Sequence, residues 1–434
     1  MLYFFVSESC DYILYCGGML RVAAYYPSPP RERSLNSARV PRQFACRMAC
    51  RANGNCMADP LITLGVLSAA AYECRRTAIR NSWAQYSEVD SGEVLVRFLS
   101  AVGPQPPAKL VAEHEKFGDI VMLQTNVTTR NIGPMLTVYR WLQFAAVEPP
   151  YSRAHYVAKL DDDGFVHVPE LAAHLRLLRD MGKVFVYYGI FYYTTWQMYK
   201  HKVGASTYDP KTAERQNSKC MAAKTCSGVF GFAAAPAQII GLDLARALAD
   251  SPKAMAYTQG SRAILDDPVA SKTFATEDSF LGYAIHDLLP DDFKGVTIAK
   301  IDRFKYTFDS WGFSLKPTTI LYHDKLKSSY RLRAAHLYAQ NHACPTNVSV
   351  SCSRRNPRAQ LAETCTLRPN NKSCPQKSTN VKSSKYFLCD VYTSKTLEAS
   401  ANLSRECLGL RQGFNGTHDV GVTWRGAMGP ACSK

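Results

Sequence analysis

Short apolar runs of strand length alternate with segments of helical period from residue 60 onwards. The run LITLGVLSA at 61–69 follows Pro60 and has the continuous apolar character of a strand buried on both faces. Further strands are expected at 93–103, 119–125, 155–165 and 183–193. Helices are expected at 74–86, 109–118, 134–147, 168–182, 236–250 and 277–289. This alternation predicts an α/β fold, in which helices cover both faces of a mainly parallel sheet.

Two segments of different composition flank this alternating region. Residues 1–56 lack clear periodicity and contain the basic, proline-containing stretch YPSPPRERS, which is typical of a linker or stem. The alternating domain is expected at 57–335, and a cysteine-rich C-terminal extension at 336–434.

The cysteines and glycosylation sequons indicate folding in the secretory lumen. Of the 15 cysteines, six lie at 10–74, two at 220 and 226, and seven at 344–432. Asn-X-Ser/Thr sequons begin at Asn126, Asn347, Asn371, Asn402 and Asn415. Disulfides persist in the lumen, although chance sequons on a chain with cytosolic thiols are the alternative. Since 15 is odd, at least one cysteine is free or pairs with another chain.

The N-terminus shows no clean signal peptide, which conflicts with a lumenal location. Its apolar stretch is interrupted by Glu8 and Asp11, and the run at 61–72 is too short to cross a bilayer. Either the true start of the chain is missing, or the N-terminal segment is a degenerate membrane anchor.

The net charge of +16, from 52 Lys+Arg and 36 Asp+Glu, first suggests nucleic-acid binding. Residues 344–434 carry 13 basic and 5 acidic residues, so half of the excess lies in the segment that also holds four sequons. No nucleic-acid-binding motif accompanies this charge, and we expect no nucleic-acid partner.

The strongest local motif is the acidic triplet Asp161, Asp162 and Asp163 in KLDDDGF, at the end of an expected strand. In open α/β sheets, ligands bind beyond the carboxyl ends of the strands. Three carboxylates there would suit Mn²⁺ or Mg²⁺ bridged to a substrate diphosphate. The alternative is an acidic surface turn that caps the helix expected at 168.

Five segments, in order over residues 60–325, support the first interpretation. They are the helix that carries Arg75, Arg76, Ala78, Ile79, Arg80, Ser82 and Trp83, then EHEKFGDIV at 113–121, KLDDDGFVHVPEL at 159–171, Cys226-Ser227-Gly228, and Glu277-Asp278. Together they resemble the motifs of the β1,3-galactosyltransferase family, glycosyltransferase family 31. Two departures are the segment at 131–135, which lacks the family's lysine, and Ser279, which replaces a valine.

This resemblance implies a GT-A type, Rossmann-like fold and an inverting transfer of galactose from UDP-galactose to a glycan, with Mn²⁺ or Mg²⁺. A transferase that uses UDP-N-acetylglucosamine and an inactive glycan-binding protein are the alternatives. The resemblance also implies a Golgi membrane protein of type II topology with a lumenal catalytic domain.

The resemblance also assigns site residues. Asp278 is the expected general base, and Glu277 would orient the acceptor hydroxyl. Asp161, Asp163 and His323 are the expected metal ligands. Asp161 and Asp162 are expected to contact the donor. Arg76 and Arg80 lie one turn apart on one helix face and are also expected at the donor, because arginine suits phosphate. The alternatives are a helix N-terminus for the Glu277-Asp278 pair, a structural role for His323 and solvated surface arginines.

An acceptor surface is expected around YYGIFYYTTWQMYKHK at 187–202. Tyr193 and Trp196 could stack on sugar rings, although a buried strand with aromatic neighbours explains the same pattern. Gly228 is expected on the acceptor side as well. Lys200 and Lys202, together with the net charge, suggest an anionic acceptor such as a phosphorylated glycan. Within the family, the chain is expected to resemble protozoan phosphoglycan β1,3-galactosyltransferases.

Overall fold

The computed structural model describes residues 59–125, 132–197, 202–263, 277–291, 293, 295–301, 307–310, 319–324, 329–342, 348–354 and 361–369. The described helices and strands all belong to one compact unit, Pro60–Lys434.

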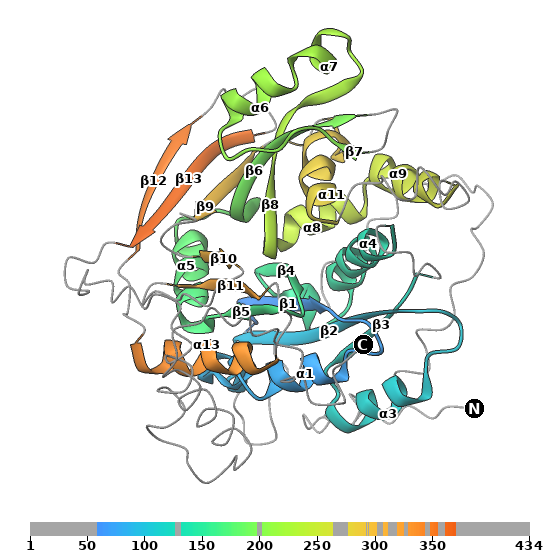
Figure 1. The fold of residues 1–434 in the computed structure, drawn as a ribbon, viewed down its shortest axis with the longest axis vertical. Coiled ribbons are helices and arrows are strands. Elements are labelled where there is room, and N and C mark those ends of the chain that lie inside the picture. The colour runs from blue at the N-terminus through green and yellow to red at the C-terminus, as the bar shows by residue number, and fades with distance from the viewer. Residues whose placement is uncertain are drawn as a thin grey trace, which may run out of the picture. The chain divides into compact units, whose positions relative to one another are not determined.

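A large mixed sheet forms the centre of this unit (Figure 1). Its strands run in the order β12-β13-β9-β6-β8-β4-β1-β2-β3, and the short β7 also pairs with β6. Their bounds are β1 Ile62–Leu67, β2 Val94–Val102, β3 Ile120–Gln124, β4 Tyr156–Asp161, β6 Val186–Gln197, β7 Lys202–Val203, β8 Cys226–Gly241, β9 Val296–Ile301, β12 Val348–Arg354 and β13 Leu361–Pro369. A second, small sheet has the order β10 (Thr307–Ser310), β11 (Leu321–Asp324) and β5 (Gly164–Val166).

The predicted mainly parallel α/β sheet is confirmed. Strand β1 pairs in parallel with β2 and β4, β2 pairs in parallel with β3, and β9 pairs in parallel with β6 and β13. Strand β8 lies antiparallel between β4 and β6. Strands β1, β2, β3 and β4 therefore end at one common edge of the sheet, and the acidic triplet lies there, at the end of β4.

Helices cover both faces of the sheet (Figure 1). One face packs against α1 (Glu73–Arg80), α5 (Val168–Asp180) and α13 (Ser329–His342). The opposite face packs against α4 (Ile132–Val147), α8 (Leu242–Ala249) and α11 (Glu277–Tyr283), which continues into a π-helical turn, Ala284–Leu288. The other helices are α2 Ser87–Asp90, α3 Ala108–Phe117, α6 Pro210–Gln216, α7 Ser218–Ala222 and α9 Pro252–Ala263, with 3₁₀ turns at Trp83–Gln85 and Tyr151–Arg153.

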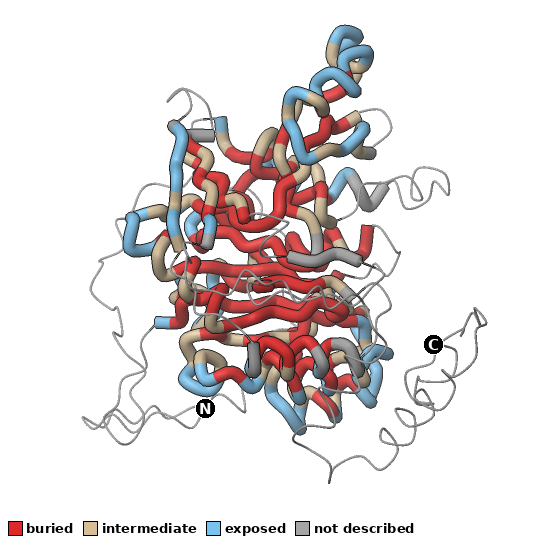
Figure 2. Tube along the Cα trace, turned by 60° about the vertical axis from the view of Figure 1, so that its left-hand side comes forward, coloured by how far each residue is buried: buried red, intermediate tan, exposed pale blue. Residues whose placement is uncertain are grey.

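Successive side chains of each strand point to opposite faces of the sheet, so the hydrophobic core consists of two parts, one on each face. On β6, Tyr188 packs into the α1/α5 side and Tyr187 into the α4/α11 side. Figure 2 shows most of the central strands as buried. A Cβ atom at Gly65 would lie 2.6 Å from the Trp141 indole nitrogen. Glycine there lets α4 approach β1 closely enough for this nitrogen to donate to the Ala158 carbonyl at 3.0 Å.

The prediction of a helix over residues 236–250 is wrong for its first six residues. Residues up to Gly241 continue β8, and α8 begins only at Leu242. Ile239 and Ile240 are both buried, on opposite faces of the sheet, and β8 pairs with β4 and β6 on either side. Tertiary pairing therefore overrides the local helical pattern here.

The C-terminal part of the chain contributes to the same sheet. Helix α13 runs across residue 336, where the extension was expected to begin. Beyond it, β13 pairs in parallel with β9, and β12 pairs with β13 in an antiparallel hairpin. Disulfides join Cys352 to Cys365 across this hairpin and Cys220 to Cys226 at the start of β8. Among the described residues, no helix is long and apolar enough to span a membrane.

Candidate active site

The acidic triplet forms the tight connection between β4 and β5. Asp161 ends β4, and Gly164 begins β5. A Cβ atom at Gly164 would lie 3.0 Å from the Pro236 side chain and 3.2 Å from the Asp161 carbonyl oxygen, so a larger residue would require these neighbours to move by a few tenths of an ångström. The Trp83 indole nitrogen donates to the Gly164 carbonyl at 3.0 Å, which fixes this turn from the other side.

The small sheet brings His323 to this turn. Strand β11 pairs antiparallel with β5, and His323 lies opposite Gly164. His323 Nε2 lies 3.2 Å from Asp163 Oδ1 and 3.9 Å from Asp161 Oδ2. The ligand atoms of these three residues all lie within 4.8 Å of one another. The structure therefore brings together all three residues expected to bind a metal.

This donor set suits a divalent cation. Carboxylate oxygens and a neutral imidazole nitrogen are ligands that Mn²⁺ accepts. Burial and the neighbouring carboxylates of Asp278, Glu277 and Asp163 raise the pKa of Asp161 to about 7, against the opposing effect of Lys159. A cluster with this excess of negative charge is stabilised by an added cation.

A buried lysine links the triplet to the predicted catalytic pair. Lys159 is 2% exposed, and its Nζ lies 2.8 Å from both Asp161 Oδ1 and Asp278 Oδ1 and 3.3 Å from Glu277 Oε1. Burial alone would lower the pKa of Lys159, but the charges of Asp161, Asp278 and Glu277 raise it well above its ordinary value. Lys159 therefore stays charged and holds carboxylates from two distant parts of the chain in one place.

The first turn of α11 is fixed against the sheet by backbone contacts as well. Gln238 lies beside Lys159 in the β4–β8 pairing, and its Nε2 donates to the Asp278 carbonyl at 2.8 Å. One turn further, a Cβ atom at Gly282 would lie only 2.4 Å from Phe232 Cβ. Helix α11 therefore packs closely against β8, which sets the position of Asp278.

Asp162 points to a different partner from its two neighbours. Its Oδ1 accepts from Arg75 at 2.7 Å, and its Oδ2 is buried without a hydrogen-bond partner among the described residues. Burial raises the pKa of Asp162, although Arg75 opposes this effect. The sequence interpretation assigned Asp162 to the donor and did not assign a role to Arg75.

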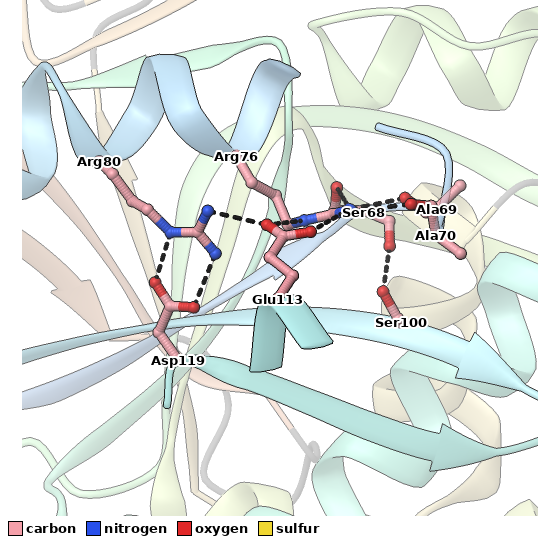
Figure 3. A network of polar contacts seen from close by, with 8 residues as sticks. All are labelled: Ser68, Ala69, Ala70, Arg76, Arg80, Ser100, Glu113 and Asp119. Atoms are coloured by element: carbon pink, nitrogen blue, oxygen red, sulfur yellow. Dashed lines mark hydrogen bonds and ion pairs between the residues drawn. The ribbon is translucent and has the colours of Figure 1, made fainter. Parts of the chain in front are cut away.

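Arg76 and Arg80 form a network of ion pairs with Glu113 and Asp119, in which Arg76 and Glu113 are buried (Figure 3). Arg76 is 0% exposed and binds both oxygens of Glu113. Arg80 binds Glu113 at 2.8 Å and both oxygens of Asp119 at 2.7 and 2.8 Å. Burial alone would raise the pKa of Glu113, but the hydrogen bonds of Arg76 and Arg80 lower it.

The expected direct contact of Arg76 with the donor does not fit its complete burial. Its guanidinium instead donates to Ser68 Oγ at 3.1 Å and to the carbonyls of Ala69 and Ala70 at 2.7 and 3.1 Å. The Ser100 hydroxyl donates to the Ser68 carbonyl at 2.6 Å. Because β1 ends at Leu67, which pairs with Asp161, this network fixes the loop that lies beside the acidic triplet.

Two expected acceptor residues are largely buried. Trp196 is 1% exposed and stacks on Tyr283, with the ring centroids 4.6 Å apart. This packing agrees with the alternative interpretation, a buried strand with aromatic neighbours. Tyr193 is 7% exposed, and its ring faces the Lys300 ammonium at 4.4 Å. Gly228 lies next to His286, whose ring would be 3.5 Å from a Cβ atom at this position.

The remaining predicted sites cannot be placed. Lys200 and the sequons at Asn126, Asn347, Asn371, Asn402 and Asn415 lie outside the described residues, and only the backbone of Lys202 is described, in β7. The sequence interpretation missed Lys159, Arg75 and Gln238. Lys159 could have been found, because residues two apart on a strand share a face and Lys159 therefore lies on the side of Asp161.

Comparison with known proteins finds relatives among glycosyltransferases. Residues 74–288 match the family model described as galactosyltransferase. The chain is 32% identical over 156 residues to N-acetyllactosaminide β-1,3-N-acetylglucosaminyltransferase 4 of Mus musculus, which covers 34% of this chain and 41% of that protein. It is 33% identical over 110 residues to hydroxyproline O-galactosyltransferase GALT2 of Arabidopsis thaliana, which covers 25% of this chain and 15% of that protein. The chain therefore spans less than half the length of these two relatives.

Solved structures of glycosyltransferases also resemble this chain at a distance. The galactosyltransferase LgtC, in complex with donor and acceptor sugar analogs, aligns with a TM-score of 0.31 and 14% identity, over 61% of this chain and 87% of that one. The mannosyltransferase Ktr4p of S. cerevisiae aligns with a TM-score of 0.31 and 11% identity, over 55% of this chain and 68% of that one.

Proposed function

This chain belongs to the β1,3-galactosyltransferase family, glycosyltransferase family 31, and we propose that it transfers galactose from UDP-galactose to a glycan hydroxyl with inversion at the anomeric carbon. One observation carries this proposal. The Asp161–Asp163–His323 cluster and the Glu277-Asp278 pair share Lys159, although more than a hundred residues separate the two acidic segments in the chain. A cation-binding cluster beside a candidate base is what a single displacement of UDP requires.

The metal cluster is the donor end of this site. Asp161, Asp163 and His323 would hold a divalent cation, and Mn²⁺ suits their mixed oxygen and nitrogen donors. Such a cation supplies charge neutralisation for a departing diphosphate. Asp162, fixed by Arg75, and the loop at 68–70, fixed by Arg76, would bind the nucleoside part of the donor. In this proposal Arg76 and Arg80 position the donor site and do not contact UDP.

Asp278 is the proposed general base. Lys159 bonds one of its carboxylate oxygens, which leaves the other oxygen to accept the proton of the acceptor hydroxyl. As the acceptor hydroxyl oxygen attacks the anomeric carbon and gives its proton to Asp278, the bond from this carbon to the diphosphate breaks on the opposite side and the configuration inverts. Glu277, held by the same lysine at 3.3 Å, would orient the acceptor by hydrogen bonding.

N-acetylglucosamine is the second candidate for the transferred sugar. Relatives named as β1,3-N-acetylglucosaminyltransferases favour UDP-N-acetylglucosamine as the donor, whereas the plant relative is named as a galactosyltransferase. We propose galactose first, because the matching family model carries that description.

The cellular setting is also a proposal. Disulfides at Cys220–Cys226 and Cys352–Cys365 and the five sequons support a lumenal domain of a Golgi membrane protein. The basic composition supports an anionic acceptor, such as the phosphoglycans of protozoa.

The test is a donor panel. The purified chain is incubated with UDP-galactose, UDP-N-acetylglucosamine and UDP-glucose in Mn²⁺, with and without glycan acceptors, and released UDP is measured. We expect acceptor-dependent UDP release from UDP-galactose that a chelator abolishes. Release from UDP-N-acetylglucosamine alone would favour the second donor. The absence of release from any donor would favour an inactive glycan-binding protein.

A further inference from the structure

A cavity of about 220 Å³ lies at the edge of the sheet opposite the acidic triplet. Its wall includes Tyr156, the first residue of β4, whereas Asp161 of the triplet is the last residue of that strand. A rise of about 3.3 Å per residue places the two residues about 17 Å apart along the strand. None of the residues assigned above to the metal, the base or the donor lines this cavity. It is therefore separate from the candidate active site.

Three segments that are distant in the chain build the wall of this cavity. They lie within residues 152–156, residues 179–184 and residues 242–246. The Leu242 backbone nitrogen donates to the His155 carbonyl at 3.0 Å, which joins the first segment to the third. A Cβ atom at Gly241 would lie 1.9 Å from the Val184 carbonyl oxygen, so the second segment packs directly against the start of the third. These backbone contacts form the cavity without a ligand.

Four cations line the cavity, namely Arg153, Arg179, Lys183 and Arg246. Helix α5 ends in a Schellman motif, in which Gly182 has a left-handed φ of 69° and the Lys183 backbone nitrogen donates to the Leu178 carbonyl at 3.0 Å. This motif fixes the backbone from which the Lys183 side chain extends. Arg246 Nη2 donates to the Ser152 carbonyl at 2.6 Å, which holds its guanidinium beside the segment that carries Arg153.

The carboxylates near these cations do not cancel their charge. Asp243 lines the cavity and accepts from Arg246 at 2.7 Å, and Asp180 and Glu363 each pair with one of the other cations. Among the described residues this leaves one positive charge in excess. The side chains of the two arginine pairs are 39–63% exposed, and exposed ion pairs are weak. An anion in the cavity can therefore compete for these guanidinium groups.

The size and the donors of the cavity fit one tetrahedral oxyanion. Its volume is below the range of about 300–1,000 Å³ that is typical of pockets for drug-sized ligands, so it suits a single small group. The planar guanidinium of arginine carries five N–H donors in a fork that matches the oxygens of phosphate. Arg246 uses one donor for Asp243 and one for the Ser152 carbonyl, so further donors of this side chain can bind an anion.

We propose that this cavity binds a phosphate group, either free phosphate or the phosphate ester of a sugar, at a site separate from the transfer reaction. Arg153, Lys183 and Arg246 bind the phosphate oxygens. Binding needs neither a divalent metal nor UDP, and the site is independent of the proposed transferase function.

The test measures the dissociation constant of inorganic phosphate for the purified chain by phosphorus NMR titration. A chelator keeps metal away from Asp161, Asp163 and His323, and chloride holds the ionic strength constant. The variants Arg153→Gln and Arg246→Gln remove cations from the cavity wall. Arg140→Gln is the matched control, because Arg140 is exposed on α4 and bonds Gln143 at 2.8 Å.

We expect Arg153→Gln and Arg246→Gln each to raise the dissociation constant about tenfold, the lower end of the range for a hydrogen bond to a charged group. Arg140→Gln keeps the wild-type value. Asp243→Asn removes the carboxylate of the wall and tightens phosphate binding up to about fivefold, the size of an exposed charge interaction. This gain in affinity cannot result from a loss of folding.

An unchanged dissociation constant in both Arg153→Gln and Arg246→Gln overturns the proposal, as does a wild type that binds phosphate no better than chloride. Arg75→Gln tests the donor site, where Arg75 holds Asp162. Phosphate binding that is weakened by Arg75→Gln and unchanged in Arg246→Gln belongs to the donor site and also overturns the proposal.

A second titration separates the two sources of phosphate. Glucose 6-phosphate replaces inorganic phosphate under the same conditions, with the wild type and Arg246→Gln. Tighter binding of the ester that is lost in Arg246→Gln assigns the cavity to a sugar phosphate. Equal or weaker binding of the ester, with inorganic phosphate still dependent on Arg246, assigns the cavity to free phosphate.

Discussion

Replacing Lys159 with methionine removes the one positive charge that the described structure places among Asp161, Glu277 and Asp278. Methionine keeps most of the side-chain volume, so the change in the free energy of unfolding comes mainly from the lost electrostatic interactions. Removing one partner of a buried ion pair costs about 3–5 kcal/mol. The carboxylates that remain here are 19–22% exposed, so the cost should lie near the lower end of this range, at about 3 kcal/mol. We expect Lys159→Met to lose about this much of its free energy of unfolding at pH 7.5 without metal.

Lys253→Met is the matched control for this substitution. Lys253 pairs with Asp291 at the surface, where the two side chains are 44% and 88% exposed. Exposed pairs of this kind contribute about 0–1 kcal/mol, so the control should remain close to the wild type. The assay is urea unfolding followed by circular dichroism, with the free energies extrapolated to water.

Two further results follow from the same reasoning. Added Mn²⁺ should recover more stability in Lys159→Met than in the wild type, because a cation at Asp161 and Asp163 replaces part of the missing charge. The double variant Lys159→Met/Asp278→Asn should lose less stability than the sum of the two single changes. If Lys159→Met unfolds within about 1 kcal/mol of the wild type, the size of a surface pair, then Lys159 does not compensate the carboxylates and the reasoning is wrong.

Three other predictions concern the frame around the site. Arg76→Met should cost about 3–5 kcal/mol of stability in urea unfolding, because it leaves the buried Glu113 without its bidentate partner; a loss near zero would contradict the network. Gly282→Ala should cost about 1–3 kcal/mol by overpacking against Phe232 and should lower kcat through displacement of α11, and unchanged kcat would contradict the tight packing. Stability should fall between pH 7 and pH 5, because burial lowers the pKa of three histidines to about 4, 3 and 4, namely His167, His174 and His336. The unfolded chain takes up these protons first, so each histidine removes about 2 kcal/mol by pH 5; His336→Phe should flatten the profile, and an unchanged profile would contradict its burial as a neutral ring.

The sequence predicts the sheet and the acidic turn well, because both depend on local patterns. The apolar run at 61–69 and the triplet after the strand at 155 need no knowledge of distant contacts. The pairing of Asp278 with this triplet is different, because it depends on β8 and α11 packing together. From the sequence, only the family resemblance predicts that Asp278 lies at the site. The structure shows that Gln238 and Lys159 hold it there through hydrogen bonds.

The errors also have physical causes. The residues at 236–241 carry a helical pattern, but they are paired with β4 and β6 on both sides, and the hydrogen bonds of a central strand override local propensity. Arg76 was expected at the donor because arginine suits phosphate. The sequence could not reveal that Glu113, on α3, would enclose the guanidinium.

The central claim is that Asp278 and the acidic cluster catalyse an inverting transfer. The most direct measurement is NMR of the product formed from UDP-galactose in Mn²⁺ by the wild type and by Asp278→Asn. We predict a β1,3-linked product from the α-linked donor, and a turnover at least about 10²-fold lower in Asp278→Asn, since a general base typically contributes 10²- to 10⁴-fold. An α-linked product, or wild-type turnover by Asp278→Asn, would contradict this account.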